Sequence, residues 1–163
     1  MSIHAVSRVP AGTSAGGRFA ETSHTEPDIG LGYKSAHTAP VNDGCSAPIA
    51  ELARVFSEEV YEHPEWYGSG ETDEEAMAQL AAARSNPEAL VRVYRALPPG
   101  LDRINRTDWV TLSARYARQH AVQDDDEGND WPVISAQVPA SSVFSDGNDL
   151  MEYGYDGPDL NCA

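Results

Sequence analysis

The stretch "VRVYRAL", residues 91–97, alternates apolar and polar side chains and therefore predicts a β-strand. On that alternation Val91, Val93 and Leu97 share the buried face, and Arg95 lies among them on the same face. A guanidinium on an apolar face needs an anion, which is either a carboxylate of the protein or a phosphate or carboxylate of a ligand. The strand leaves both alternatives open, together with exposure of Arg95 at a sheet edge.

Two helices are expected before this strand. The first is predicted from Ser46 onward, because apolar residues recur there at helical spacing as far as Val60. The second is predicted from Thr72 to Ala83, where Thr72 and Glu75 form a T-x-x-E capping box.

Short strands dominate the chain after residue 97. We expect strands in "DWVTLS" (residues 108–113), "WPVISAQV" (131–138) and the segment 150–155, and one short helix in "ARYARQH" (114–120). Helices first and strands later, with one short helix between strands, predict an α+β fold rather than alternating βαβ units.

The 163 residues suffice for one modest domain with loose ends. Residues 1–45, rich in Gly, Ser, Thr, Ala and Pro without apolar periodicity, are expected to be a flexible arm, and residues 46–163 the folded domain. No segment approaches the roughly 18 consecutive apolar residues of a membrane span, and no apolar signal-peptide core is present, so a cytoplasmic location is expected. Cys45 and Cys162 belong to no metal or redox spacing and are expected to be free thiols.

The formal net charge is −15, and residues 1–40 contain three basic and three acidic groups, so the expected domain carries the excess negative charge. Such a surface opposes unaided, non-specific binding to nucleic acid or to anionic lipid. It leaves open a basic protein partner or mimicry of nucleic acid.

Several common sites are not supported by the sequence. Ser113 and His120 lie in one local segment without a G-x-S-x-G elbow or an independent orienting acid, which argues against a serine hydrolase. The acidic run at residues 124–130 does not fit the calcium spacing of an EF-hand and is expected to be a solvated loop. No metal site is predicted.

Two further segments contain candidate site residues. Ser113 can cap the helix that follows it, and Tyr116 and His120 then lie one turn apart on one face, which simple packing also explains. Glu152, flanked by Tyr153 in the last expected strand, is either a solvated carboxylate or a partly buried one that holds a hydroxyl or opposes a developing cation.

The order of these features resembles the R-S-E branch of the ADP-ribosyltransferase superfamily, and most closely its small members in phages and mobile elements. The matching segments are "VYRAL", "DWVTLSARYARQH" and "GNDLMEYGY", within about residues 91–157. The resemblance implies a split antiparallel sheet with a small N-terminal helical lobe. It also implies NAD as a substrate and transfer of its ADP-ribose to a macromolecular acceptor, in the first place a protein of the host or of its defence machinery.

Each site residue is assigned from this resemblance. Arg95 would hold the NAD diphosphate and the adjoining ribose, and Ser113, with Thr111 in the same strand, would support the nicotinamide half of the pocket. Tyr116 would line the nicotinamide site, and Glu152 would be the catalytic glutamate that hydrogen-bonds the ribose 2′-hydroxyl.

Two departures from the family pattern affect these assignments. The strand reads T-L-S instead of S-T-S, and Leu150 stands where arginine-modifying members carry a second Glu or Gln, so arginine is not favoured as the acceptor. Asp149 and Asp156 compete with Glu152, because a one-residue slip changes which side chain faces the cleft. The alternative function is a non-catalytic acidic binding protein, either a degenerate transferase fold or a nucleic-acid mimic.

Overall fold

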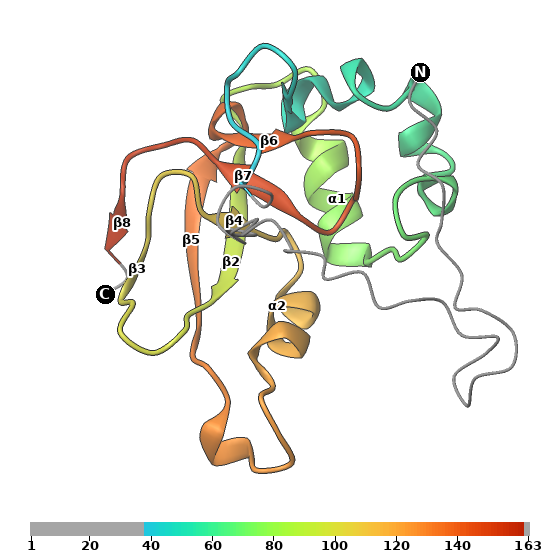
Figure 1. The fold of residues 1–163 in the computed structure, drawn as a ribbon. Helices are drawn as coiled ribbons and strands as arrows, with labels where there is room; N and C mark the ends of the chain where they lie inside the picture. Colours follow the sequence, from blue (N-terminus) through green and yellow to red (C-terminus); the bar gives the residue numbers. More distant parts are fainter. Residues whose placement is uncertain (1–37, 162–163) are drawn as a thin grey trace, which may run out of the picture. The chain divides into compact units, whose positions relative to one another are not determined.

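The predicted strand around Arg95 is present as β2, Leu90–Ala96, which pairs antiparallel along its whole length with β5, Val133–Pro139. Residue 95 faces Ile134 in this register. The structure, a computed structural model, describes residues 38–161 (Figure 1). None of the helices in this part of the chain is long and apolar enough to cross a membrane.

A second, four-stranded sheet has the antiparallel order β1-β6-β7-β4. Its strands are β1 (Ala47–Pro48), β6 (Val143–Ser145), β7 (Tyr153–Tyr155) and β4 (Trp109–Val110). A small pair joins β3 (Arg103–Ile104) to β8 (Leu160–Asn161). A bridge between Tyr94 and Thr111 connects β2 to the end of β4, so the two larger sheets meet beside Arg95. The α+β class is thereby confirmed.

The helical part consists of two α-helices and short 3₁₀ helices. The α-helices are α1 (Glu74–Ala83) and α2 (Ala114–Ala121). The 3₁₀ helices are η1 (Ile49–Arg54), η2 (Glu58–Tyr61), η3 (Pro64–Trp66), η4 (Glu127–Asn129) and η5 (Ala140–Ser142). The helix expected at 114–120 is confirmed as α2.

The first predicted helix, from Ser46 to an expected end by His63–Pro64, is wrong in type. Pro48 is extended and pairs with β6, Glu51 has non-helical dihedrals within η1, and Ser57 caps the separate helix η2. Ile49, Leu52 and Val60 are nevertheless buried, and Phe56 is half-buried against the same core. Within η1 the repeat of three residues per turn places Ile49 and Leu52 on one side. The periodicity predicted burial correctly and the helix type incorrectly.

The second predicted helix is present, but its cap is not the expected one. Asp73, not Thr72, is the N-cap, and its Oδ1 accepts hydrogen bonds from the N–H groups of Glu75 at 3.1 Å and Ala76 at 3.2 Å. A carboxylate one residue after the threonine satisfies the free amides of the first turn. The T-x-x-E box therefore does not form.

The strand expected at residues 150–155 is shorter, since β7 begins at Tyr153. Asp149 bends the chain before it by accepting a 2.6 Å hydrogen bond from the N–H of Met151. Glu152 consequently precedes the strand instead of lying inside it. The strand expected at 108–113 is likewise limited to β4 and the bridge at Thr111.

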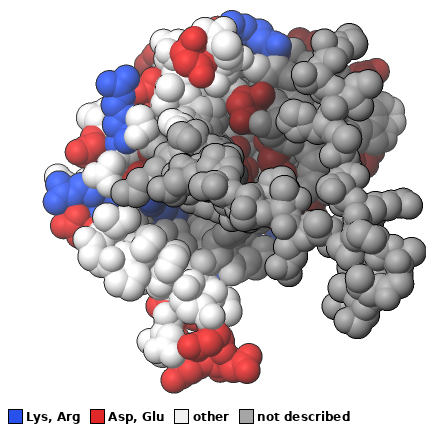
Figure 2. Space-filling view, in the orientation of Figure 1, with Lys and Arg blue, Asp and Glu red and all other residues white. Residues whose placement is uncertain are grey.

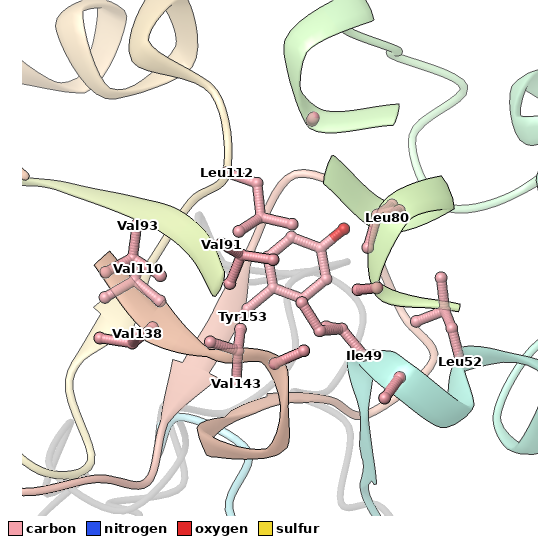
Figure 3. Close-up of a cluster of buried hydrophobic side chains, with 14 of the residues drawn as sticks. Ile49, Leu52, Leu80, Val91, Val93, Val110, Leu112, Val138, Val143 and Tyr153 are labelled. Carbon is pink, nitrogen blue, oxygen red and sulfur yellow. The ribbon is translucent and has the colours of Figure 1, made fainter. Parts of the chain in front are cut away.

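The hydrophobic core lies between the helices and the sheets, with the ring of Tyr153 at its centre (Figure 3). Leu80 of α1, Val91 of β2 and Ile49 of η1 surround this ring from different elements. The buried hydroxyl of Tyr153 donates a 2.6 Å hydrogen bond to the carbonyl of Leu150, which removes the cost of burying it unpaired.

Residues 38–45, expected to belong to the flexible arm, include a packed segment. Ala39 and Pro40 are buried, and the N–H of Asn42 donates a 3.0 Å hydrogen bond to Oδ2 of Asp156. A Cβ on Gly154 of β7 would lie 1.7 Å from the Pro40 carbonyl oxygen, so only glycine permits this approach. Residues 1–37, the rest of the predicted arm, and Cys162 lie outside the described residues, and Cys45 is an exposed free thiol.

Acidic side chains gather on the loop that contains η4, at the lower tip of the molecule in Figure 2. Residues 122–129 are exposed throughout, as expected for a solvated loop. Within residues 38–161 no group of three or more His, Cys, Asp or Glu side chains is arranged to hold a metal ion.

Candidate functional site

A pocket of about 240 Å³ lies where β2, β4 and α2 meet. Four of the five residues assigned from the sequence line it, namely Arg95, Thr111, Tyr116 and Glu152. Its other lining residues are Tyr94, Ala96, Pro98, Trp109, Val110, Ala117, His120 and Trp131. The wall is thus mainly aromatic and apolar, with a few convergent polar groups, which is typical of small-molecule sites.

Arg95 is held by the protein itself. Its Nη1 lies 3.0 Å from Oδ1 of Asp108 and donates a 3.1 Å hydrogen bond to the carbonyl of Trp109. The two charged side chains are 17% and 18% exposed, so the pair is mostly desolvated. The anion that the strand pattern required is therefore present in the protein, as one of the two alternatives anticipated.

Asp108 is itself fixed by a tight turn. Its Oδ2 accepts hydrogen bonds from the backbone N–H of Asn105 at 2.7 Å and from the Asn105 side-chain amide at 3.2 Å. Within the turn Thr107 has a φ of +71°, a strained conformation for a β-branched residue, and its N–H donates to the carbonyl of Tyr155 at 2.7 Å. The turn thus anchors the carboxylate that positions Arg95.

Arg95 retains donors for a ligand. Both of its contacts within residues 38–161 use Nη1, and Nε is buried there without a hydrogen-bond partner. A guanidinium has five N–H donors in a rigid fork, so Nη2 can bind an acceptor in the pocket while Nη1 keeps Asp108.

Glu152 is a second polar lining residue of the pocket. Its Oε1 accepts a 3.1 Å hydrogen bond from the hydroxyl of Tyr116 and lies 3.9 Å from Nε2 of His120. The rings of Tyr116 and His120, one helical turn apart, are 4.5 Å apart between centroids. Partial burial raises the pKa of Tyr116, and the adjacent Glu152 charge raises it further, so the phenol stays a neutral donor.

Ser113 is not a lining residue. It is fully buried at the N-cap of α2, where its Oγ accepts a 3.1 Å hydrogen bond from the N–H of Tyr116. Its own N–H donates to Oγ1 of Thr111 at 3.2 Å. Ser113 caps α2, as expected from the sequence. It affects the pocket by fixing the position of Tyr116, which is a lining residue.

Helix α1 is hydrogen-bonded to both β2 and α2, which form two walls of the pocket. Glu75 accepts a 2.5 Å hydrogen bond from the hydroxyl of Tyr94 and a 3.1 Å hydrogen bond from the N–H of Ala114. The pKa of Tyr94 is raised to about 12, chiefly by burial and then by Glu75. Gln79 bonds the backbone of both Arg92 and Leu112, so β2 and the start of α2 are tied to one helix.

Asp73 adds a third connection at the start of α1. It pairs with Nε of Arg115 at 3.1 Å. Partial burial acts to raise the pKa of Asp73, but hydrogen bonds from Arg115, from the N–H of Ala76 and from Ser113 hold it below its usual value. The N-terminal ends of α1 and α2 are thereby joined by polar contacts.

The two carboxylates that competed with Glu152 serve other contacts. Asp156 is only 7% exposed and pairs with Nε of Arg106 at 2.5 Å, and its pKa is lowered by the N–H of Asn42 and then by Arg106. Asp149 accepts hydrogen bonds from Met151 and Ser69 in the bend before β7. Neither lines the pocket, whereas Glu152 does.

Four lining aromatics had no role in the sequence-based assignment: Tyr94, Trp109, His120 and Trp131. His120 carried a signal, its helical spacing from Tyr116. Trp131 reaches the pocket because its N–H donates to the carbonyl of Ala121 at 2.9 Å, a long-range contact that no local pattern predicts.

A second hollow, of about 500 Å³, is lined by η1, η2 and the end of α1. Its arginines are already paired, Arg54 with Glu51 at 2.8 Å and Arg84 with Glu58. Arginines that are already paired on an exposed surface contribute little to the binding of a ligand. Comparison of the whole chain with family models, with curated proteins and with solved structures finds no match.

Proposed function

We propose that the protein is an NAD-dependent mono-ADP-ribosyltransferase with an ADP-ribosyltransferase-like fold. The observation that carries the proposal is the convergence of Arg95, Tyr116 and Glu152, from three separate segments, on one pocket. The family pattern requires Arg95, Ser113 and Glu152 together: Arg95 and Glu152 line this pocket, whereas Ser113 is buried at the N-cap of the helix that carries Tyr116. Placement of these side chains on unrelated surfaces would have argued against the proposal.

The roles are those that the resemblance implies, and the contacts of each residue are compatible with them. Tyr116 and the neighbouring aromatics accommodate the planar nicotinamide ring, and Glu152 accepts a hydrogen bond from the ribose 2′-hydroxyl. Arg95 donates to the diphosphate through Nη2. Thr111 and Ser113 support the site by fixing the first turn of α2.

The chemistry requires stabilisation of a developing positive charge. When the bond between C1′ and the nicotinamide nitrogen breaks, its electron pair leaves with nicotinamide and the ribose becomes oxocarbenium-like. A carboxylate held in place by Tyr116 stabilises that charge more than it stabilises the uncharged ribose of the ground state. An acceptor nucleophile then bonds to C1′ and loses its proton.

The acceptor is proposed to be a macromolecule, in the first place a protein. Leu150 is 1% exposed and supplies no second polar group beside Glu152, so the site is not built to prepare an arginine. An acidic enzyme of this kind fits a basic host or defence protein as target, since opposite charge speeds their encounter.

The second candidate is a non-catalytic acidic binding protein. The observation that favours it is the pair of Arg95 with Asp108, because a neutralised guanidinium attracts a diphosphate less strongly than a free one. In this alternative the pocket still binds a ligand, but no glycosidic bond is broken.

The deciding experiment measures nicotinamide release from NAD⁺ by mass spectrometry, with and without a cell lysate as a source of acceptor. Glu152→Gln is expected to lower release by at least about 100-fold. The matched control is Glu88→Gln, an exposed carboxylate outside the pocket, which is expected to retain wild-type release. Release that persists in Glu152→Gln would exclude Glu152 as the catalytic carboxylate, and no release in any lysate while NAD⁺ still binds would favour the binding protein.

A further inference from the structure

The segment before β7 provides no proton acceptor for an incoming nucleophile other than Glu152 itself. Leu150, two residues earlier, is apolar and 1% exposed. A nucleophile that bonds to C1′ must still lose a proton, unless it is already an anion. A pocket that accelerates this step therefore needs a proton acceptor from another element.

Most polar lining groups are unsuitable as proton acceptors. Burial first, and then the charge of Glu152, raises the pKa of Tyr116, so its phenol stays protonated. The raised pKa of Tyr94 has the same effect. Arg95 is a cation without an acceptor atom, and Glu152 faces the ribose in the proposed mechanism. Of the lining residues that the structure describes, His120 is best suited, since a neutral imidazole accepts a proton near neutral pH.

Helix α2 places His120 close to Glu152. The Nε2 atom of His120 lies 3.9 Å from Oε1 of Glu152, too far for a hydrogen bond but within range of its charge. Tyr116, one helical turn earlier, packs against the imidazole with 4.5 Å between ring centroids. The side chain of His120 is 55% exposed, so a macromolecule that approaches the pocket from solvent can reach it.

The carboxylate of Glu152 favours proton transfer to His120. As nicotinamide departs, positive charge develops on the ribose beside Glu152. When an acceptor oxygen bonds to C1′, this charge leaves the ribose and passes, with the proton, to the imidazole. The imidazolium also lies beside Glu152, so the same carboxylate stabilises the charge before and after the transfer.

We propose that His120 is the general base of the transfer step and that the acceptor is a hydroxyl group, as in serine or threonine. This inference deepens the proposed function and rests on it. A lone pair of the hydroxyl oxygen forms the bond to C1′, and the O–H proton passes to a ring nitrogen of His120. The exposed imidazolium then releases this proton to water.

An imidazole base selects among acceptor groups by their chemistry. A hydroxyl becomes acidic as its oxygen bonds to C1′, so a neutral imidazole can take its proton. A guanidinium, with a pKa above about 12, holds its proton too tightly for an imidazole to remove it. A carboxylate has no proton to lose and is repelled by Glu152. A hydroxyl is therefore the acceptor to which His120 contributes most.

The test lets two small nucleophiles compete in one reaction of NAD⁺ with the full chain. Methanol must lose a proton when it attacks C1′, whereas azide is an anion and needs no base. Mass spectrometry measures the methyl glycoside and the azide of ADP-ribose, and the ratio of the two products reports the step in which the base acts. His120→Gln is expected to lower the ratio of methyl to azide product at least about 100-fold.

Matched variants separate a base from a structural contribution. His63→Gln changes a histidine that is 44% exposed and lies outside the pocket, and it is expected to keep the wild-type ratio. His120→Asn, with a shorter amide, is expected to behave as His120→Gln. An unchanged ratio in both His120 variants, or an equal loss of both products, overturns the inference.

Failure of the proposed function gives a different result. The wild-type protein would then form neither product and release no nicotinamide from NAD⁺. If the wild-type protein forms both products and the His120 variants keep its ratio, the proposed function stands and the role of His120 as general base falls.

Discussion

The hydroxyl of Tyr116 and the carboxylate of Glu152 are joined by a 3.1 Å hydrogen bond between α2 and the segment before β7. The bond fixes the carboxylate from the helix side while His120 borders the same oxygen. Replacing Tyr116 with Phe keeps the ring and removes this restraint.

Tyr116→Phe is expected to reduce nicotinamide release about tenfold, because Glu152 loses the donor that orients it. The loss in folding stability is expected to be only about 1 kcal/mol, the net value of one hydrogen bond. Release and urea unfolding are measured on the same preparation. The matched change Tyr67→Phe, remote from the pocket, is expected to leave release unchanged; wild-type release by Tyr116→Phe would show that the bond is incidental.

The pair of Arg95 with Asp108 predicts a large stability difference between two ion pairs. Asp108→Ala leaves a mostly buried guanidinium without its carboxylate and is expected to cost about 3 kcal/mol. Asp102→Ala removes the partner of Arg103 at a site where the aspartate is 76% exposed, so little or no loss of stability is expected. Urea denaturation compares the two, and equal losses would contradict the assigned burial.

Thr107, in the turn before β4, has a strained backbone conformation that a substitution can relieve. Thr107→Asn is expected to stabilise the fold by about 1 kcal/mol, because asparagine tolerates the positive φ that a β-branched residue resists. Thr72→Asn, at an exposed position with ordinary φ, is the matched control and is expected to be neutral. A higher Tm for the first variant alone supports the assignment; a lower one shows that the threonine contributes contacts that outweigh its strain.

The contact of Gly154 with Pro40 predicts intolerance of any side chain. Gly154→Ala is expected to displace residues 38–42 from β7 and cost about 3 kcal/mol, since the obstructing atom is backbone. Gly44→Ala is a control for backbone strain alone, because its φ is +84° with open space around it. Limited proteolysis near residue 42 would detect the displacement, and resistance equal to wild type would contradict it.

The raised pKa values of Tyr94 and Tyr153 predict how folding stability changes at alkaline pH. The pKa of Tyr94 in the folded protein, about 12, lies above its unfolded value of about 10, so its contribution to stability is complete below pH 10 and declines as pH rises toward 12. Burial raises the pKa of Tyr153 in the same direction. Tm measured from pH 8 to 12 should therefore fall above pH 10, and fall less steeply in Tyr94→Phe. An identical slope would contradict this origin.

Much of the pocket follows from local patterns in the sequence. Alternation around Arg95, helical spacing between Tyr116 and His120, and the serine cap at Ser113 each depend on neighbours within a few residues. Those patterns fix which way a side chain points and whether it is buried. They therefore predicted β2 and α2, which carry the candidate residues Arg95 and Tyr116.

The remainder depends on contacts distant in sequence. Asp108 becomes the partner of Arg95 only because a turn brings it there, and Ile49 is buried from a short 3₁₀ helix that the apolar spacing did not distinguish from an α-helix. Trp131 reaches the pocket through a contact with the end of α2. No periodicity distinguishes such arrangements before the chain has folded.

Glu75 and Gln79 bind the two walls of the pocket from the far side, although neither lines it. A ligand that steadies β2 and α2 must therefore also steady α1, because local opening of that helix would release both walls. Amide hydrogen exchange should therefore slow along residues 76–83 when a ligand binds in the pocket. Exchange in α1 would then report ligand binding, although α1 does not line the pocket.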